Sequence, residues 1–409
     1  MDFSTLYEQG CGKKYAYNFD EIIERHGTDS LKYDLAVKRG MPGDILPFWV
    51  ADMDFKSPPE VLDALSRRIR HGIFGYSHTA GESYFNALYN WYNDRFDWQI
   101  RPEWLVKTPG VVFSICIAIR TLTKPGDAVI IQQPVYHPFE NSVKNNGRRL
   151  VVNQLLYGSG RYQINYNEFE RLIAEENVKM FILCNPHNPV GRVWTREELI
   201  QLGDICVRHG VYVVSDEIHQ DFVYPGYKHS VFAALKPEYA DIAVTCTAPS
   251  KTFNIPGLKI SNIFISNEKI RRLFLEELKK LGYGQPNLMG MLACQAAYEK
   301  GAHWLDELIC YLSDNLALFR KFLSDELPDI YMVEPEGTYL LWLDFSKLGL
   351  SDTELEQLLV HKAKIWLNSG PTFGAGGQGF QRFNIACPRA VLQEGLNRLK
   401  NAFQDIINQ

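Results

Sequence analysis

The feature that most constrains the fold is an alternation, in the middle of the chain, of short β-branched runs with amphipathic helical stretches. The candidate strands are residues 128–131, 180–184, 211–215, 242–246 and 260–265. Between two of them, Thr195 and Glu198 form a capping box that begins a helix, and Gly210 ends it. Strand–helix–strand repetition predicts an α/β fold with a mainly parallel sheet between helices.

The two ends of the chain predict a second unit. Ser57 and Glu60 form another capping box with proline in the first helical turn, and Gly72 is the matching stop. Beyond about Asn287 the pattern changes to long helices, followed by strands at 330–334, 338–345 and 380–385, with helices at 353–364 and at the end of the chain. We therefore expect a large domain, residues 51–286, and a smaller α+β domain formed by residues 1–50 and 287–409.

Composition excludes several classes of protein. Hydrophobic residues make up 46% and charged residues 22% of the 409 residues, so the chain is not disordered. A net charge of −5 without basic blocks predicts no nucleic-acid or membrane partner and favours a small molecule. No apolar run approaches the ~20 residues of a membrane span, and the start lacks a secretory pattern, so we expect the cytoplasm. The eight cysteines and ten histidines lack metal-ligand spacing, so no metal is predicted and the cysteines are interpreted as reduced packing residues.

Three segments that carry functional groups follow predicted strands, at the edge where open α/β sheets bind ligands: 185–191, 215–219 and 247–252. Lys251 can form an imine with an aldehyde if burial lowers its pKa. Asp216, at the end of an apolar strand, requires a cation such as a pyridinium N–H. Asn188, between prolines, can donate its amide N–H to a phenolate oxygen. Each residue alone has an ordinary alternative, as a solvated lysine, a helix cap or a turn, but together they indicate pyridoxal phosphate.

The whole chain resembles the fold-type-I pyridoxal-phosphate enzymes of the aspartate aminotransferase superfamily, and within it the MalY/PatB cystathionine β-lyases (C–S lyases). The stretches that carry the resemblance are residues 49–55, 75–76, 185–191, 215–219, 250–256 and 382–389. The resemblance implies that Lys251 forms the covalent imine and Asp216 pairs with the ring nitrogen. It also implies that Asn188 contacts the ring hydroxyl and that Tyr136 stacks on the ring, although Tyr136 could instead be ordinary core packing.

The resemblance also implies the phosphate and substrate contacts. The phosphate would be bound at the start of a predicted helix, by Gly110, Val111, Val112, Ser250 and Lys259, and by Tyr76 from the partner subunit of a homodimer. The substrate α-carboxylate would be bound by Arg382, with Val50, Ala51 and Asn188 nearby; a surface ion pair is the alternative for Arg382. Asp52 and Asp54 are interpreted as structural.

Three positions depart from the wider superfamily. His219 stands where tyrosine is usual, which agrees with the lyase branch; it could donate to the ring oxygen or only satisfy a core contact. Lys259 replaces a usual arginine and Ala248 a common serine. The phosphate site could therefore be rebuilt around Thr247 or Ser250.

The predicted activity is α,β-elimination of cystathionine or a related S-substituted L-cysteine to a thiol, pyruvate and ammonia. One alternative is an aminotransferase, which would use the same residues and return the proton elsewhere. The other is a regulatory protein on this scaffold, in which catalysis would be incidental. The sequence does not indicate which sulfur amino acid is preferred, because one methylene changes binding by only ~1–3 kcal/mol.

Overall fold

The structure is a computed structural model that describes residues 15–78 and 81–407. Its centre is a seven-stranded sheet with the strand order β2-β10-β9-β8-β7-β3-β4. The strands are β2 (Leu105–Thr108), β3 (Ala128–Gln133), β4 (Arg149–Gln154), β7 (Val178–Cys184), β8 (Tyr212–Asp216), β9 (Ala243–Thr247) and β10 (Ser261–Phe264). Strands β4, β3, β7, β8 and β9 are parallel, whereas β10 runs antiparallel to both of its neighbours. The predicted fold class is confirmed.

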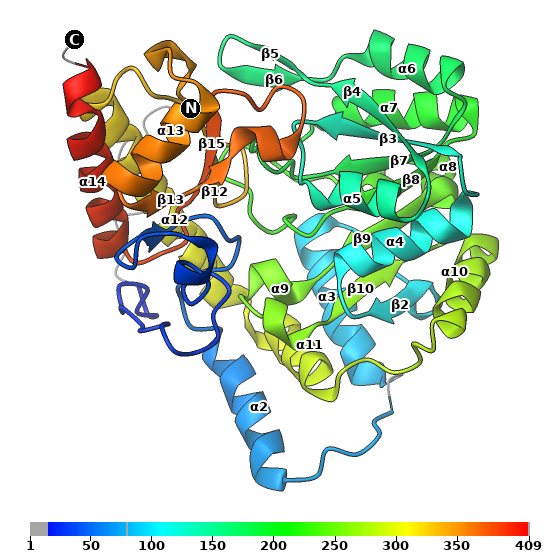
Figure 1. Cartoon of the computed structure of the whole chain (residues 1–409). Coiled ribbons are helices and arrows are strands. Elements are labelled where there is room, and N and C mark those ends of the chain that lie inside the picture. Colours follow the sequence, from blue (N-terminus) through cyan, green and yellow to red (C-terminus); the bar gives the residue numbers. More distant parts are fainter. Residues whose placement is uncertain (1–14, 79–80, 408–409) are drawn as a thin grey trace.

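Helices cover both faces of this sheet because successive strand residues point to opposite sides. Val129 and Ile131 pack with helices α4 (Val111–Leu122), α5 (Pro138–Asn145) and α10 (Glu268–Lys280). Ala128 and Ile130 belong to the cluster on the other face, which includes helices α6 (Tyr166–Glu175), α7 (Arg196–His209) and α8 (Pro237–Ile242). Figure 1 shows these helices around the sheet.

One predicted capping box is present and the other is not. The Thr195 side chain caps α7 reciprocally with Glu198, and Gly210 ends the helix at φ 66°. In contrast, α2 (Pro59–His71) begins after Pro58 without a side-chain cap, so the prediction for Ser57 was wrong. The Ser57 hydroxyl donates instead to the Asn254 carbonyl at 3.3 Å. Gly72 ends α2 at φ 76°, as predicted.

A second, antiparallel sheet lies near the C-terminus, with the order β11-β12-β15-β14. Its strands are β11 (Tyr331–Val333), β12 (Leu340–Asp344), β14 (Asn368–Ser369) and β15 (Phe380–Asn384). The helix expected at 353–364 is α13 (Asp352–Gln357) followed by one π-helical segment, Leu358–Lys362. The N-terminal strand β1 (Leu46–Pro47) pairs with β13 (Ile365–Trp366), which attaches the start of the chain to this part. The domain boundaries themselves stay a prediction.

The remaining helices are α3 (Glu82–Phe96), α9 (Pro249–Thr252), α11 (Leu288–Lys300), α12 (Ala302–Glu326) and α14 (Arg389–Ile407). A hairpin is formed by β5 (Leu156–Gly158) and β6 (Arg161–Gln163). The short 3-10 helices are Val37–Arg39, Pro102–Trp104, Phe232–Ala234, Pro256–Leu258, Ser346–Leu348 and Gly370–Phe373. Over the described residues, none of the helices combines the length and apolar character that a bilayer span needs.

Candidate active site

A cavity of about 420 Å³ lies where β7, β8 and β9 end. Strand register aligns Cys184 with Asp216 and Asp216 with Cys246, so the segments that follow these strands start side by side. The cavity is lined by most of the predicted site residues: Ala51, Gly110, Val111, Val112, Tyr136, Asn188, Asp216, His219, Ser250, Lys251 and Lys259. The sequence segments predicted to meet at one edge of the sheet therefore do meet.

Lys251 lies in the short helix α9 and is half-buried. Its Nζ donates to the Ala51 carbonyl at 2.7 Å. Burial lowers the pKa of this amine to about 8, and the positive charge of Arg382 acts in the same direction. A larger fraction of the amine is therefore neutral near pH 7 than for an ordinary lysine, and the neutral form is the nucleophile and base.

Asp216 is a buried carboxylate at the end of β8. One of its oxygens accepts the Ile218 N–H at 3.1 Å, and the described residues provide no ion pair for it. Burial raises the pKa of this carboxyl to about 7. A cationic N–H placed in the cavity would stabilise the ionised form, because opposite charge favours ionisation.

His219, near the same strand end, is buried and its Nδ1 has no hydrogen-bond partner in the described chain. Burial holds the pKa of the imidazole well below its usual value, and the charges of Lys251 and Arg382 add to this effect. The ring lies edge-on to Tyr339, with centroids 5.9 Å apart. The His219 ring is therefore neutral near pH 7 and lines the cavity.

Arg382 lies on β15 and is 4% exposed, so the alternative of a surface ion pair is wrong. It donates from Nη1 to Asn188 Oδ1 at 2.9 Å and from Nη2 to the Trp49 carbonyl at 2.8 Å and Asn368 Oδ1 at 2.5 Å. Its Nε has no partner, and burial lowers its pKa to about 10. The guanidinium thus meets only neutral acceptors in the described chain, which leaves its charge available to an anionic ligand.

Asn188 contacts both Arg382 and Tyr136. Because Asn188 Oδ1 accepts from Arg382, its amide hydrogens remain available to a ligand. The Asn188 carbonyl accepts the Tyr136 N–H at 3.0 Å. The Tyr136 ring is half-buried, lines the cavity and also packs edge-on against Phe139 at 6.0 Å.

The start of helix α4 forms the anion-binding part of the cavity. Gly110 caps the helix without a side chain, and Val111 and Val112 provide the first helical N–H groups. Ser250 and Lys259 line the same cavity. Thr247 does not line it: its hydroxyl donates to the Asn262 carbonyl at 2.8 Å and accepts from Tyr92. Of the two alternatives for a rebuilt phosphate site, the structure therefore favours Ser250.

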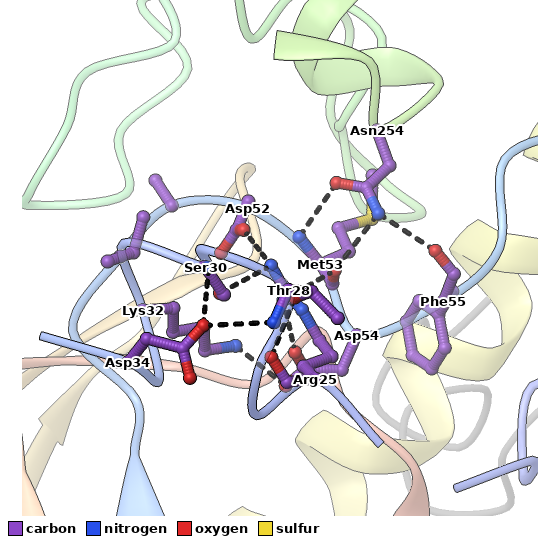
Figure 2. A network of polar contacts seen from close by, with 12 residues as sticks. Arg25, Thr28, Ser30, Lys32, Asp34, Asp52, Met53, Asp54, Phe55 and Asn254 are labelled. Atoms are coloured by element: carbon purple, nitrogen blue, oxygen red, sulfur yellow. Dashed lines mark hydrogen bonds and ion pairs between the residues drawn. The ribbon is translucent and has the colours of Figure 1, made fainter. Parts of the chain in front are cut away.

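Asp52 and Asp54 belong to a network of polar contacts (Figure 2), and neither is among the residues that line the cavity. Arg25 pairs with both carboxylates at 2.6 Å, and buried Lys32 donates to Asp54 at 2.7 Å. These ion pairs support the structural interpretation of both residues. Sequence reasoning missed Asn254, which donates to the Met53 carbonyl at 2.9 Å and accepts the Met53 N–H at 3.0 Å, although it lies in the motif around Lys251.

Three predicted residues lie apart from the cavity lining of their own chain: Arg382, which contacts the lining residue Asn188, and Val50 and Tyr76. Val50 contributes its carbonyl, which accepts from Asn384 Nδ2 at 2.6 Å. Tyr76 is 99% exposed on the segment after α2, and this segment reaches away from the rest of the chain (Figure 1).

A reactive amine, a buried carboxylate and an anion-binding helix start line one cavity, and the buried Arg382 guanidinium donates to Asn188 in its wall. A sequence model of aminotransferase class I and II matches residues 44–399. The chain belongs to this family.

Among class I and II relatives, cystathionine β-lyase PatB of Bacillus subtilis (strain 168) is 47% identical over 94% of this chain and 99% of its own length. Protein MalY of Escherichia coli (strain K12) is 34% identical over 95% of this chain and 100% of its own. The crystal structure of cystalysin from Treponema denticola, which contains pyridoxal 5'-phosphate, matches with a TM-score of 0.92. It is 39% identical and covers 96% of this chain and 100% of its own. The predicted family resemblance is confirmed.

The cavity fits pyridoxal phosphate on its own chemistry. The aldehyde has an amine to react with, Lys251, and the ring nitrogen has a buried carboxylate without an ion pair, Asp216. The phosphate has the N-terminus of α4, which has no side-chain cap.

Proposed function

We propose that the protein is a pyridoxal-phosphate-dependent C–S β-lyase that converts cystathionine or a related S-substituted L-cysteine to a thiol, pyruvate and ammonia. The observation that carries the proposal is the full-length similarity to a cystathionine β-lyase, PatB, in a chain whose cavity unites Lys251, Asp216 and the start of α4. This activity belongs to sulfur amino-acid metabolism, and we propose the cytoplasm as its compartment.

The cofactor would be held by residues of the cavity wall. Asp216 would pair with its ring nitrogen, Asn188 would donate to its ring oxygen, and the Tyr136 ring would cover one face. Its phosphate would accept hydrogen bonds from the backbone of Gly110, Val111 and Val112, and from Ser250 and Lys259. His219 would contribute a neutral ring to the same wall. When bound, pyridoxal phosphate supplies an electron sink next to the substrate Cα.

The protein's own groups then position the substrate and move the proton. Arg382 binds the α-carboxylate, with the backbone of Val50 and Ala51 nearby, so that Cα faces Lys251. The Lys251 amine, desolvated and partly neutral, takes the Cα proton as general base. The Cβ–S electron pair leaves with sulfur, which is released as a thiol after protonation. Water hydrolyses the released enamine to pyruvate and ammonia, which balances the reaction.

The direct test incubates the purified protein with cystathionine, and separately with alanine and a keto acid. Pyruvate, homocysteine, ammonia and new amino acid are measured together. A lyase produces pyruvate and homocysteine in equal amounts from cystathionine. Amino transfer to the keto acid without pyruvate from cystathionine would instead identify an aminotransferase.

We also propose a homodimer with shared sites, in which Tyr76 reaches the cofactor phosphate of the partner. Tyr76 is accompanied by exposed Ile69, Ile73 and Phe74, an apolar group that a solitary chain would leave in water. Mixing Tyr76→Phe and Lys251→Ala subunits tests this arrangement. A shared site produces hybrid dimers with one intact site, so activity rises above that of both parents after subunit exchange. If exchange is demonstrated and activity does not rise, Tyr76 does not act across the interface.

A further inference from the structure

Residues 49–53, which we call the strap segment, lie beside the cavity outside any sheet of the structure. All five of their carbonyls accept hydrogen bonds from distant side chains. The donors, in chain order of the carbonyls, are Arg382 to Trp49, Asn384 to Val50, Lys251 and Tyr339 to Ala51, Asn384 to Asp52, and Asn254 and Arg25 to Met53. A loop usually leaves such carbonyls to water, so this segment is held in one conformation.

The Ala51 carbonyl is the only one of these five that meets the reactive amine. It accepts from Lys251 Nζ at 2.7 Å and from the Tyr339 hydroxyl at 2.9 Å. A carbonyl oxygen has two lone pairs, so both donors can bind at once. The Tyr339 hydroxyl therefore occupies one lone pair and leaves the other directed to the lysine.

Tyr339 is itself fixed in place. Its side chain is fully buried and packs edge-on against Phe222, with ring centroids 4.8 Å apart. The backbone on either side is also held, since the Thr338 N–H donates to the Phe222 carbonyl at 2.9 Å and the Ile385 N–H donates to the Tyr339 carbonyl at 3.0 Å. The hydroxyl thus approaches Ala51 from a rigid support.

The peptide units around Ala51 are fixed independently of Tyr339. Asn384 Nδ2 donates to the Val50 carbonyl at 2.6 Å and to the Asp52 carbonyl at 2.7 Å. The strap therefore retains its course if the Tyr339 hydroxyl is lost, and only the second donor on the Ala51 carbonyl disappears. This separation makes the contribution of that hydroxyl measurable.

We propose that Tyr339 is a positioning residue for Lys251: its hydroxyl fixes the Ala51 carbonyl as the acceptor that aims the amine whenever the amine is not covalently engaged. The inference rests on the proposed function, because it takes Lys251 as the reacting amine. The strap would hold the Lys251 amine in position during the part of each turnover in which that amine is free, because the amine must be released and must then react again. Arg382 contacts the strap through Trp49, so the carboxylate site does not depend on Tyr339.

The test is Tyr339→Phe in the cofactor-loaded protein, because this change removes the hydroxyl and retains the ring. L-Alanine, which has no leaving group at Cβ, is mixed rapidly with the protein, and the rate of the visible absorbance change reports exchange of the lysine amine. Loss of one neutral hydrogen bond predicts that this rate and kcat for cystathionine fall by about two- to twelve-fold. KM changes less than kcat, because Arg382 and its contacts remain.

Tyr239→Phe is the matched control. Tyr239 is also a buried tyrosine, and its hydroxyl lies 2.9 Å from the Ile200 carbonyl and 2.5 Å from Asp204 Oδ1, so its loss costs at least as much bonding as at Tyr339. It lies in the cluster on the other face of the central sheet from α4. The control is expected to lose thermal stability without slowing the alanine reaction. The inference is overturned if Tyr339→Phe exchanges alanine at the wild-type rate, or if both variants slow it equally.

The same measurements separate the inference from the proposed function. If the wild-type protein reacts with alanine but makes no pyruvate from cystathionine, the lyase assignment fails. The Tyr339 inference is then still decided by the alanine rate. If neither alanine nor cystathionine produces an absorbance change in the loaded wild-type protein, Lys251 is not the exchanging amine and both fail together.

Discussion

Two walls of the cavity are built by different means. The wall at the sheet edge carries Asp216, the last residue of β8, and Asn188 and Lys251, which follow the ends of β7 and β9. Pairing of these parallel strands brings the three residues together. The strap wall has no strand partners and is held by side chains 200 to 334 residues away in the sequence, together with Arg25, which is 28 residues from Met53. The difference indicates that the sheet edge carries the reactive groups, whereas the strap sets the positions of Lys251 and Arg382.

The two walls also differ in charge. The sheet edge carries a buried carboxylate whose pKa is raised to about 7, which makes it a strong partner for a cation. The strap presents backbone carbonyls to Lys251 and Arg382, and its own acid, Asp52, is paired with Arg25 at 2.6 Å. Substitutions on the sheet edge should therefore abolish chemistry, whereas those on the strap should change its rate or the affinity by smaller factors.

The largest effect is expected at the sheet edge, from Lys251→Ala. One amine serves as imine former and as general base, so its removal should abolish nearly all turnover. Mass spectrometry after borohydride reduction should find the cofactor covalently attached to the wild-type protein and absent from the variant. A variant that retained most of the lyase rate would contradict the proposed mechanism.

The next largest effect is expected from Asp216→Ala, with Asp216→Asn as the variant that keeps the shape. Removing one partner of a buried ion pair costs about 3–5 kcal/mol, so kcat should fall by about two to four orders of magnitude. Asp216 would keep the ring nitrogen protonated, which matters most when the ring accepts electrons as the Cα proton leaves, so the loss should appear in kcat more than in cofactor affinity. Titration of the apo-protein with cofactor, together with kcat, separates the two; a loss of affinity alone would leave Asp216 a binding residue only.

The sequence predicted the sheet edge well for a physical reason. Each group there follows a run of β-branched residues within a few positions, so local pattern and the rules of parallel sheets suffice. Even so, the run at 260–265 became an antiparallel strand, and β2 and β4 were missed. β4 lies at the edge of the sheet, begins and ends with the exposed residues Arg149 and Gln154, and alternates half-buried with buried residues between them.

The strap could be predicted only in part. The resemblance pointed to Val50, Ala51 and Arg382, but Tyr339, Asn254 and Asn384 contact the strap over long sequence separations that no periodicity reports. The failed capping box at Ser57 has the same origin, because its hydroxyl bonds to the Asn254 carbonyl rather than to its own helix. At these positions tertiary contacts, and not the local sequence pattern, determine the hydrogen-bond partners.

Arg382→Leu tests the strap wall where it meets the substrate. Loss of a charge-assisted hydrogen bond worth about 1.5–3 kcal/mol should raise KM by about 10- to 150-fold while the visible spectrum of the loaded protein stays intact. Arg382→Lys is the matched variant, since it keeps the positive charge and loses the planar guanidinium. Its KM should lie between that of the wild type and that of Arg382→Leu. Unchanged KM in both variants would place the carboxylate site elsewhere.

The smallest effect separates backbone conformation from side-chain bonding at Asn254, which holds the strap. Asn254 has φ 55°, a left-handed conformation that glycine adopts freely and alanine adopts at a cost of about 1–2 kcal/mol. Both Asn254→Gly and Asn254→Ala lose the bonds to Met53 and Phe55, so both should lower kcat by a few-fold. Only the alanine variant should also be destabilised by the left-handed backbone conformation, so its free energy of unfolding should be lower than that of the glycine variant by about 1 kcal/mol.

Asn177 provides the control for this last comparison, because it has φ 50°, is exposed, and its only side-chain bond in the described chain is from Lys179. Asn177→Ala should lose about as much stability relative to Asn177→Gly as the pair at 254, since the backbone cost is the same. Neither change at 177 should alter kcat, because the residue lies before β7, at the opposite end of that strand from the cavity. Urea unfolding of all four variants measures the backbone cost at each position, and kcat measured in parallel shows whether the loss at 254 also affects catalysis. If neither change at 254 lowers kcat, as is expected at 177, the strap does not set the geometry of Lys251 through Asn254, and the distinction between the two walls is lost at that contact.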